Sequence, residues 1–426
     1  MNSIYTLCKN VLFYVINTFL LFMFIYQIKL STFGVPEQLI SPRLAAICFI
    51  IFGFLFFFHN LRIRNRIYSP HTSKEFRKYV IIMLLLAGYG LILYITIGIK
   101  EGDSFLVTMA NICLFSIPVT WILTKIYRGI DDFMISLVLV GIAQSVIIIT
   151  CLVDNSFAAL LDFTFNDTYS PDLRGGYAGG LSCIAAPGVI RYSISLIAVC
   201  YLYVKYKKVY LLLLFVFFAV IVTMIARTGV LIDVICTVFI IACSANSKVL
   251  IRLAIPTILI VFVLYLLVDS GNYSDFLSER YNRMNELKES GLRRSFFDGY
   301  FSGSYIPLEL ETLFGVGVVS GRSGNGYLIN VDGGFLRIYS AIGLIFSICI
   351  YAYLFRMILK TSSFFVDRMK KYYIWLFFVF FAIADFKEIT FFLVYPMCIF
   401  FVSAILMERE QSYLKIQSNN RISIKL

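Results

Sequence analysis

The side chains best suited to chemistry gather in a polar, glycine-rich segment from Leu313 to Leu344, LFGVGVVSGRSGNGYLINVDGGFLRIYSAIGL, which stands among apolar stretches. It holds two arginines, Arg322 and Arg337, and one carboxylate, Asp332. Non-helical backbone near a bilayer persists only where water or protein satisfies its amide groups, and charged side chains have the same need. We therefore expect a water-filled cavity in which guanidinium and carboxylate groups meet a polar ligand.

The rest of the chain has the composition of an integral membrane protein. Of its 426 residues, 60% are hydrophobic and 17% are aromatic, whereas soluble domains contain about 45–50% apolar residues. Because a span needs about 20 mostly apolar residues, we predict an all-α polytopic membrane protein with about twelve transmembrane helices in a single membrane domain, 1–426. The predicted spans are 11–28, 44–58, 79–99, 105–124, 133–153, 192–204, 210–226, 229–243, 253–268, 334–355, 372–384 and 389–406.

The distribution of basic residues predicts the orientation. If the N-terminus is cytoplasmic, most of the 37 lysines and arginines fall in cytoplasmic segments, and the short links on the other side hold few. This bias places both termini in the cytoplasm, with a cytoplasmic tail at 407–426 and two large outside loops at 154–191 and 269–333. The net charge of +12 is then mainly a topology signal and gives little reason to expect nucleic acid.

The basic residues of the outside loops are almost all arginine. Arginine offers a planar fork that grips phosphate oxygens in pairs, whereas lysine is a hydrated point charge, so the enrichment favours a phosphate-bearing ligand. Contacts to lipid headgroups or to acids of the same loops are the alternative. The residues concerned are Arg174, Arg191, Arg280, Arg283, Lys288, Arg293, Arg294, Arg322 and Arg337.

Arg227 lies between two apolar stretches, in MIARTGVLID. A charge at such a position costs roughly 2.5–3.5 kcal/mol on insertion, so it indicates an anionic partner. Asp233 could be that partner, but six residues of helix correspond to about 600° and leave the two side chains on different faces. We favour a ligand phosphate.

Cysteines and histidines predict neither disulfides, nor a metal, nor a cofactor. Nearly all of the ten cysteines lie in or beside apolar spans, so buried free thiols are expected. Both histidines, His59 and His71, fall in a basic loop predicted to be cytoplasmic. The outside loops offer no cluster with metal-ligand spacing.

The outside loops have local structure of their own. Glycines between Arg174 and Arg191 predict turns or re-entrant backbone, and apolar residues at helical spacing over 276–287 predict a helix lying on the membrane surface. The glycines of GVGVVSG resemble part of a dinucleotide-binding loop, but Ser320 occupies the third glycine position and we expect no strand there, so we reject that motif.

In layout, and in four short patches, the chain resembles the Wzy-type O-antigen polymerases, which belong to a group that also contains the O-antigen ligases. The patches are RGGYAGGLSCIAAPG, ARTGVL, SGLRRSFFDGY, and LFGVGV followed by DGGFLRIYSAIGL. The resemblance implies a GT-C-like, metal-independent glycosyltransferase of the bacterial inner membrane, with periplasmic outside loops. Its substrates would be undecaprenyl-diphosphate-linked oligosaccharides, and a chain-length regulator is a further candidate partner.

The resemblance also suggests roles for individual residues. Family arginines grip the donor diphosphate, and the matching positions are Arg174, Arg227 and either Arg293 or Arg294. Because a departing lipid diphosphate gains negative charge, guanidinium groups such as that of Arg227 can stabilise it without a divalent ion. Arg191, at the mouth of a span, is a further candidate diphosphate ligand.

The acceptor hydroxyl needs a base, and Asp332 is the first choice because Gly333 and Gly334 leave room for a sugar. Glu309 and Glu311 are the reserves. Asp332 could instead be a helix N-cap, and Arg337 could either bind phosphate or neutralise Asp332.

Two other functions remain open at this point. A ligase of the same group relies on a histidine in the large outside loop, and this chain has none there. A flippase or transporter for lipid-linked oligosaccharides is also compatible with twelve spans, but it predicts charges at mid-membrane rather than at the outer face.

Overall fold

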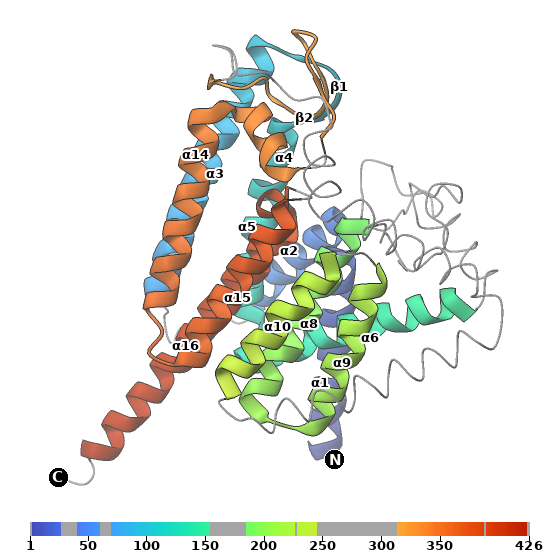
Figure 1. The fold of residues 1–426 in the computed structure, drawn as a ribbon. Coiled ribbons are helices and arrows are strands. Elements are labelled where there is room, and N and C mark those ends of the chain that lie inside the picture. The colour runs from blue at the N-terminus through green and yellow to red at the C-terminus, as the bar shows by residue number, and fades with distance from the viewer. Residues whose placement is uncertain are drawn as a thin grey trace. The chain divides into compact units, whose positions relative to one another are not determined.

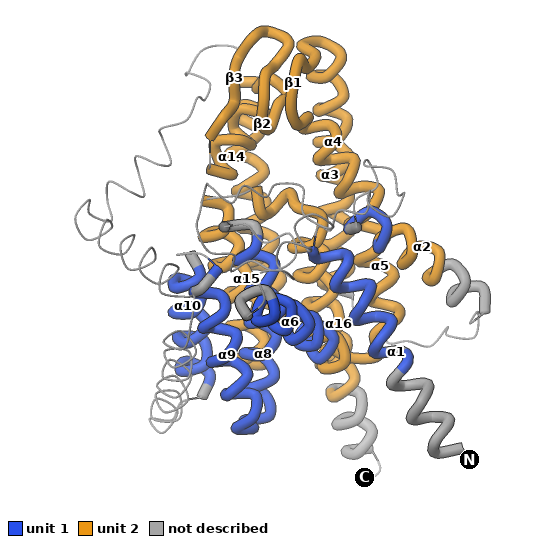
Figure 2. The backbone as a smooth tube through the Cα atoms, turned by 90° about the vertical axis from the view of Figure 1, so that its right-hand side faces the viewer, with its two compact units in different colours: residues 1–45, 134–301 blue, residues 46–133, 302–426 orange. Residues whose placement is uncertain are grey.

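A computed structural model of the chain describes residues 2–26, 41–59, 70–153, 185–225, 228–244, 313–331, 333–386 and 389–423. Helices dominate these residues (Figure 1). They belong to two compact units, unit 1 with residues 1–45 and 134–301, and unit 2 with residues 46–133 and 302–426 (Figure 2). Each unit therefore combines segments that are far apart in the sequence.

The helices have the lengths and apolar character expected of membrane spans. Five of those described are long and apolar enough to cross a membrane, namely His71–Thr96, Phe105–Ile126, Ile130–Thr150, Gly188–Tyr206 and Gly334–Ser363. Shorter apolar helices accompany them at Tyr14–Ile25, Pro42–Gly53, Val209–Thr223 and Gly229–Cys243. Many large apolar side chains on these helices are exposed, as lipid contact requires. The prediction of a helical, membrane-embedded protein is confirmed.

Unit 1 is built around one central helix. Its elements are α1 (Asn2–Ile25), α6 (Ile130–Val153, from residue 134), α8 (Ala185–Tyr206), α9 (Val209–Ile225) and α10 (Thr228–Ser244). On α8 every residue from Gly188 to Val204 is buried, and α8 packs on both α9 and α10. Gly141 lets α6 approach closely, because a Cβ there would come within 2.6 Å of Ser195 and 2.7 Å of Phe218.

Unit 2 contains the longer helices and all the described strands. Its helices are α2 (Ser41–His59, from residue 46), α3 (Pro70–Thr96), α4 (Phe105–Asn111), the π-helix η2 (Ile112–Ser116), α5 (Ile117–Ile126), α14 (Gly334–Ser363), α15 (Arg368–Asp385), the 3₁₀ helix η5 (Thr390–Phe392) and α16 (Val394–Ser423). Its strands are β1 (Ile99–Ser104), β2 (Val318–Ser323) and β3 (Leu328–Ile329). The helices α3 and α14 lie side by side (Figure 1).

One end of unit 2 is held together by α16. The carboxylate of Glu408 caps the N-terminus of α3, since its oxygens accept hydrogen bonds from the backbone N–H groups of His71 at 3.0 Å and Thr72 at 2.8 Å. Two neighbours of Glu408 bind other helices: Glu410 pairs with Lys370 of α15 at 2.8 Å, and Arg409 donates to a carbonyl of α5. The predicted tail at 407–426 therefore begins inside a helix that is part of the bundle.

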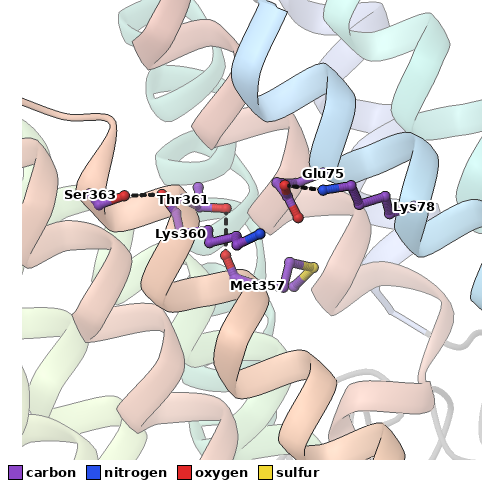
Figure 3. Close-up of polar contacts among 6 residues, drawn as sticks. All are labelled: Glu75, Lys78, Met357, Lys360, Thr361 and Ser363. Atoms are coloured by element: carbon purple, nitrogen blue, oxygen red, sulfur yellow. Dashed lines mark hydrogen bonds and ion pairs between the residues drawn. The ribbon is translucent and has the colours of Figure 1, made fainter.

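Some polar side chains close to that end make local contacts within one helix. Glu75 and Lys78 form an i,i+3 ion pair on α3 at 2.7 Å. On the last turns of α14, the hydroxyls of Thr361 and Ser363 donate to backbone carbonyls of the preceding turn (Figure 3). Such contacts satisfy polar groups at helix ends and need no ligand.

The predicted spans overlap the described helices, and one prediction about unit 2 is corrected. A described helix overlaps every predicted span except 253–268, which lies outside the described residues. The absence of a strand at GVGVVSG was predicted wrongly, because β2 begins at Val318. The predicted span 334–355 lies within the candidate span Gly334–Ser363, whose helix α14 is interrupted at Gly343. The predicted surface helix at 276–287 lies outside the described residues.

Candidate functional site

The glycine-rich segment folds into a small sheet at one end of unit 2, beside the ends of α3, α4 and α14 (Figure 2). Strand order is β1-β2-β3, and both pairings are antiparallel. The strand β1 follows α3 directly, whereas β2 and β3 precede α14, so pairing joins two distant parts of the chain. We call this end of the unit the sheet end.

One face of the sheet is charged and exposed. Glu101 pairs with Arg322, and Arg322 pairs with Leu328, so the three side chains form a row across the strands. Asp103, two residues after Glu101, lies on the same face and pairs with Ser320. Glu101, Asp103, Arg322 and Leu328 are all exposed.

The charged groups of that face are available to a ligand. Within the described part of the chain, no ion pair or side-chain hydrogen bond involves Glu101, Asp103 or Arg322. Carboxylates accept hydrogen bonds from hydroxyl groups and a guanidinium donates several, so this face can bind a polar, hydroxyl-rich molecule. The opposite face is apolar, with Val316, Val318 and Ile329 as its core and Ile99 and Tyr327 packed against them.

Glycines bring the two main strands unusually close. Gly102 and Gly321 face each other, with φ of 96° and 107°. A Cβ on Gly102 would lie 2.1 Å from the carbonyl oxygen of Ser320, and one on Gly321 would lie 2.3 Å from that of Glu101. Only glycine adopts this conformation without strain and leaves this space, so the pair fixes the register that sets Glu101 opposite Arg322.

Residues 314–317, which we call the crossing segment, run from the sheet across the break in α14. The N–H groups of Val316 and Gly317 donate to the carbonyls of Ser340 and Ala341, both at 2.9 Å. Those carbonyls end the short first part of α14, 334–342, and have no partner within a helix that stops there. The crossing segment thus replaces the missing helical turn and attaches the sheet to the short helix.

Arg337 is on that short helix, and its side chain hydrogen-bonds back to Val331. Its backbone N–H donates to the carbonyl of Gly333 at 3.0 Å, and its Nε donates to the carbonyl of Val331 at 2.6 Å. The two acceptors stand on either side of residue 332 in the chain. Asp332 itself lies outside the described residues, but the N-cap of α14 is Gly333. The role of the Asp332 side chain, as a base or as a cap at the start of the helix, stays a prediction.

Arg191 lies in unit 1 and is 9% exposed. It occupies the second turn of α8, where Tyr192 hydrogen-bonds Ser145 of α6 and Ser195 donates to the carbonyl of Leu137 at 2.7 Å. A buried guanidinium needs partners for its charge, and Arg191 has a partner within the described part of the chain. Its role as a diphosphate ligand stays a prediction.

Asp233, considered above as a partner of Arg227, projects from α10. Neither of its carboxylate oxygens has a hydrogen-bond partner among the described residues, and both are buried. Arg227 lies outside the described residues, as do Arg174, Arg293, Arg294, Glu309 and Glu311. Their predicted roles stay predictions.

Comparison with known proteins adds no assignment. No family model, curated protein or solved structure matches the chain.

The described residues contain no group of three or more histidine, cysteine or acidic side chains that could hold a metal ion. Sequence reasoning missed Glu101 and Asp103, because KEGDS reads as a short link between two spans. Three charges in five residues, with a glycine at the centre, were the signal that this link has its own structure.

Proposed function

We propose that this protein is an O-antigen polymerase of the bacterial inner membrane. It moves a growing glycan from undecaprenyl diphosphate onto a lipid-linked repeat unit at the periplasmic face. In this proposal the chain has a GT-C-like arrangement of about twelve spans, both termini are cytoplasmic, and the sheet end of unit 2 faces the periplasm.

The observation that carries the proposal is the position of Arg337. Its side chain donates from Nε to the carbonyl of Val331, the residue just before Asp332. A guanidinium is thus held beside the segment of the predicted base, at the end of an apolar helix and next to an exposed charged sheet. Phosphate, carboxylate and sugar hydroxyls are the ligands that such groups recognise.

The proposed reaction is a direct displacement. An acceptor hydroxyl oxygen attacks the anomeric carbon of the donor glycan, its proton passes to the Asp332 carboxylate, and a new glycosidic bond forms. The bond between the anomeric carbon and the phosphate oxygen breaks, and its electron pair stays on the lipid diphosphate. Arg227, with Arg174 and Arg293 or Arg294, stabilises that charge, and Arg191 and Arg337 are additional diphosphate ligands.

The exposed face of the sheet is suited to binding the sugar part of the substrates. Glu101, Asp103 and Arg322 offer hydrogen-bond acceptors and donors to sugar hydroxyls, and Leu328 offers an apolar contact. Lipid-linked sugars reach this face without leaving the membrane surface, because the sheet joins α3 and α14 directly.

The test is reconstitution of the purified protein in liposomes with isolated undecaprenyl-diphosphate-linked repeat units. A ladder of lipid-linked polymers, formed with a divalent-metal chelator present, is the expected product. Transfer of the glycan to lipid A core instead would identify a ligase, and movement of the repeat unit across the bilayer without any polymer would identify a flippase.

A further inference from the structure

The short helix that carries Arg337 is held in place by the crossing segment, whose glycines allow its backbone many conformations. The crossing segment contains Gly315 and Gly317, with φ of 78° and 76°, and it meets the break at Gly343, with φ of 83°. Glycine has more conformational freedom than any other residue, so three of them at one junction allow many arrangements. Contacts from neighbouring elements must therefore select one arrangement.

Backbone contacts supply part of that selection. Besides the two hydrogen bonds to Ser340 and Ala341, the carbonyl of Gly317 accepts from the N–H of Phe105, the first residue of α4, at 3.0 Å. These bonds fix the C-terminal half of the crossing segment. They do not fix its beginning, at Phe314.

Tyr89 of α3 holds the beginning. Its hydroxyl donates to the carbonyl oxygen of Phe314. Its ring also packs on Phe346, with centroids 4.4 Å apart. Phe314 is the first residue of the crossing segment and Phe346 follows the break, so one side chain contacts both. In the described residues, no other side chain hydrogen-bonds to the crossing segment.

We propose that Tyr89 is a positioning residue for the transfer reaction. Tyr89 positions the crossing segment, the crossing segment positions the short helix 334–342, and that helix positions Arg337 relative to Val331. This inference rests on the proposed function, because it assigns Arg337 and Asp332 to the reacting site. Tyr89 itself touches no substrate.

The primary variant is Tyr89→Phe, which keeps the ring on Phe346 and removes only the hydroxyl. Loss of one neutral hydrogen bond at this junction is expected to lower kcat about fivefold. The KM for the lipid-linked acceptor and the protein level in the membrane are expected to stay at wild-type values. The matched control is Tyr94→Phe on the same helix, whose side chain is exposed and which is expected to behave as wild type.

A double-mutant cycle separates positioning from general stability. If Tyr89 acts through Arg337, then Tyr89→Phe added to Arg337→Lys lowers kcat no further than Arg337→Lys alone. Two effects that multiply would overturn the proposal. Phe346→Leu supplies a second, independent variant, since it removes the ring contact but keeps the hydroxyl, and a smaller kcat loss in the same direction is expected.

The outcomes separate failure of the proposed function from failure of the positioning role alone. If wild-type protein makes no polymer from the lipid-linked repeat unit, the proposed function fails. If wild-type protein polymerises and Arg337→Lys is impaired while Tyr89→Phe has wild-type kcat, only the positioning role fails. Amide hydrogen exchange over 334–342 gives a reading that needs no activity, because Tyr89→Phe is expected to speed exchange there, and an unchanged rate contradicts the inference.

Discussion

Because α14 is interrupted at Gly343, the addition of a single methyl group there by Gly343→Ala is expected to lower the stability of the protein strongly. The backbone there has φ 83° and ψ 169°, a conformation that costs a residue with a side chain about 1–3 kcal/mol. A Cβ would also lie 2.2 Å from the carbonyl oxygen of Leu313 and 2.6 Å from the N of Gly315. Relief of such overlap by backbone movement costs typically about 1–3 kcal/mol more.

The two contributions together give about 2–6 kcal/mol for Gly343→Ala, a large share of the stability of a typical domain. We expect a lower melting temperature of the purified protein in detergent and loss of polymer in the liposome assay. The crossing segment cannot keep its contacts to Ser340 and Ala341 if the helix straightens. Gly88→Ala is the control, because nothing lies within 4 Å of a Cβ at that position of α3. A Gly343→Ala protein with wild-type melting and wild-type polymer would refute the described break.

Three other predictions concern the donor site, the bundle and the orientation. Arg227→Lys keeps the charge but loses paired contacts to phosphate oxygens, so polymerisation is expected to fall about a hundredfold or more at matched protein level, whereas Arg283→Lys is expected to be tolerated. Wild-type activity of Arg227→Lys would withdraw the donor-site assignment. Glu408→Gln weakens the cap of α3, so a loss of about 1 kcal/mol is expected as a lower melting temperature with polymer formation intact, and an unchanged melting temperature would contradict the cap. Reporter fusions are expected to read as periplasmic after residues 172 and 303 and as cytoplasmic after 69 and 407, and a cytoplasmic reading after 303 would reverse the orientation.

The positions of the helices could be predicted because apolar length is a local property. A run of about 20 apolar residues identifies a span wherever it lies, which is why α3, α6 and α8 overlap their predicted ranges. Helix ends were less predictable, since α16 continues through Glu408 and Glu410, residues that look like a solvated tail until their partners on α3 and α15 are known.

The sheet end could not be predicted because its pairing is not local. Nothing in KEGDS identifies Val318–Ser323 as its partner, and the glycines that make the pairing possible resemble ordinary loop glycines. The same holds for Gly343, which reads as one small residue within an apolar span. Its conformation depends on Leu313 and Gly315, whose carbonyl and amide occupy the space that a side chain would fill.

The sequence predicted which types of residue the candidate site contains, but only part of their arrangement. Arg337 was predicted to bind phosphate or to neutralise Asp332, and both roles stay predictions. The charged row of Glu101 and Arg322 depends on strand register and was not predicted. The predicted diphosphate ligands Arg174, Arg227, Arg293 and Arg294 lie outside the described residues, so the donor half of the site is argued from the sequence alone.

The most direct test of the central claim is the lipopolysaccharide of a host strain from which this gene has been deleted. A polymerase extends the glycan, whereas separate steps deliver the repeat unit and attach it to the lipid core. We therefore predict that the deletion strain carries lipopolysaccharide capped with a single repeat unit, and that the gene supplied in trans restores the ladder. A full ladder in the deletion strain would contradict the account, and loss of even the single unit would point to a ligase or a flippase.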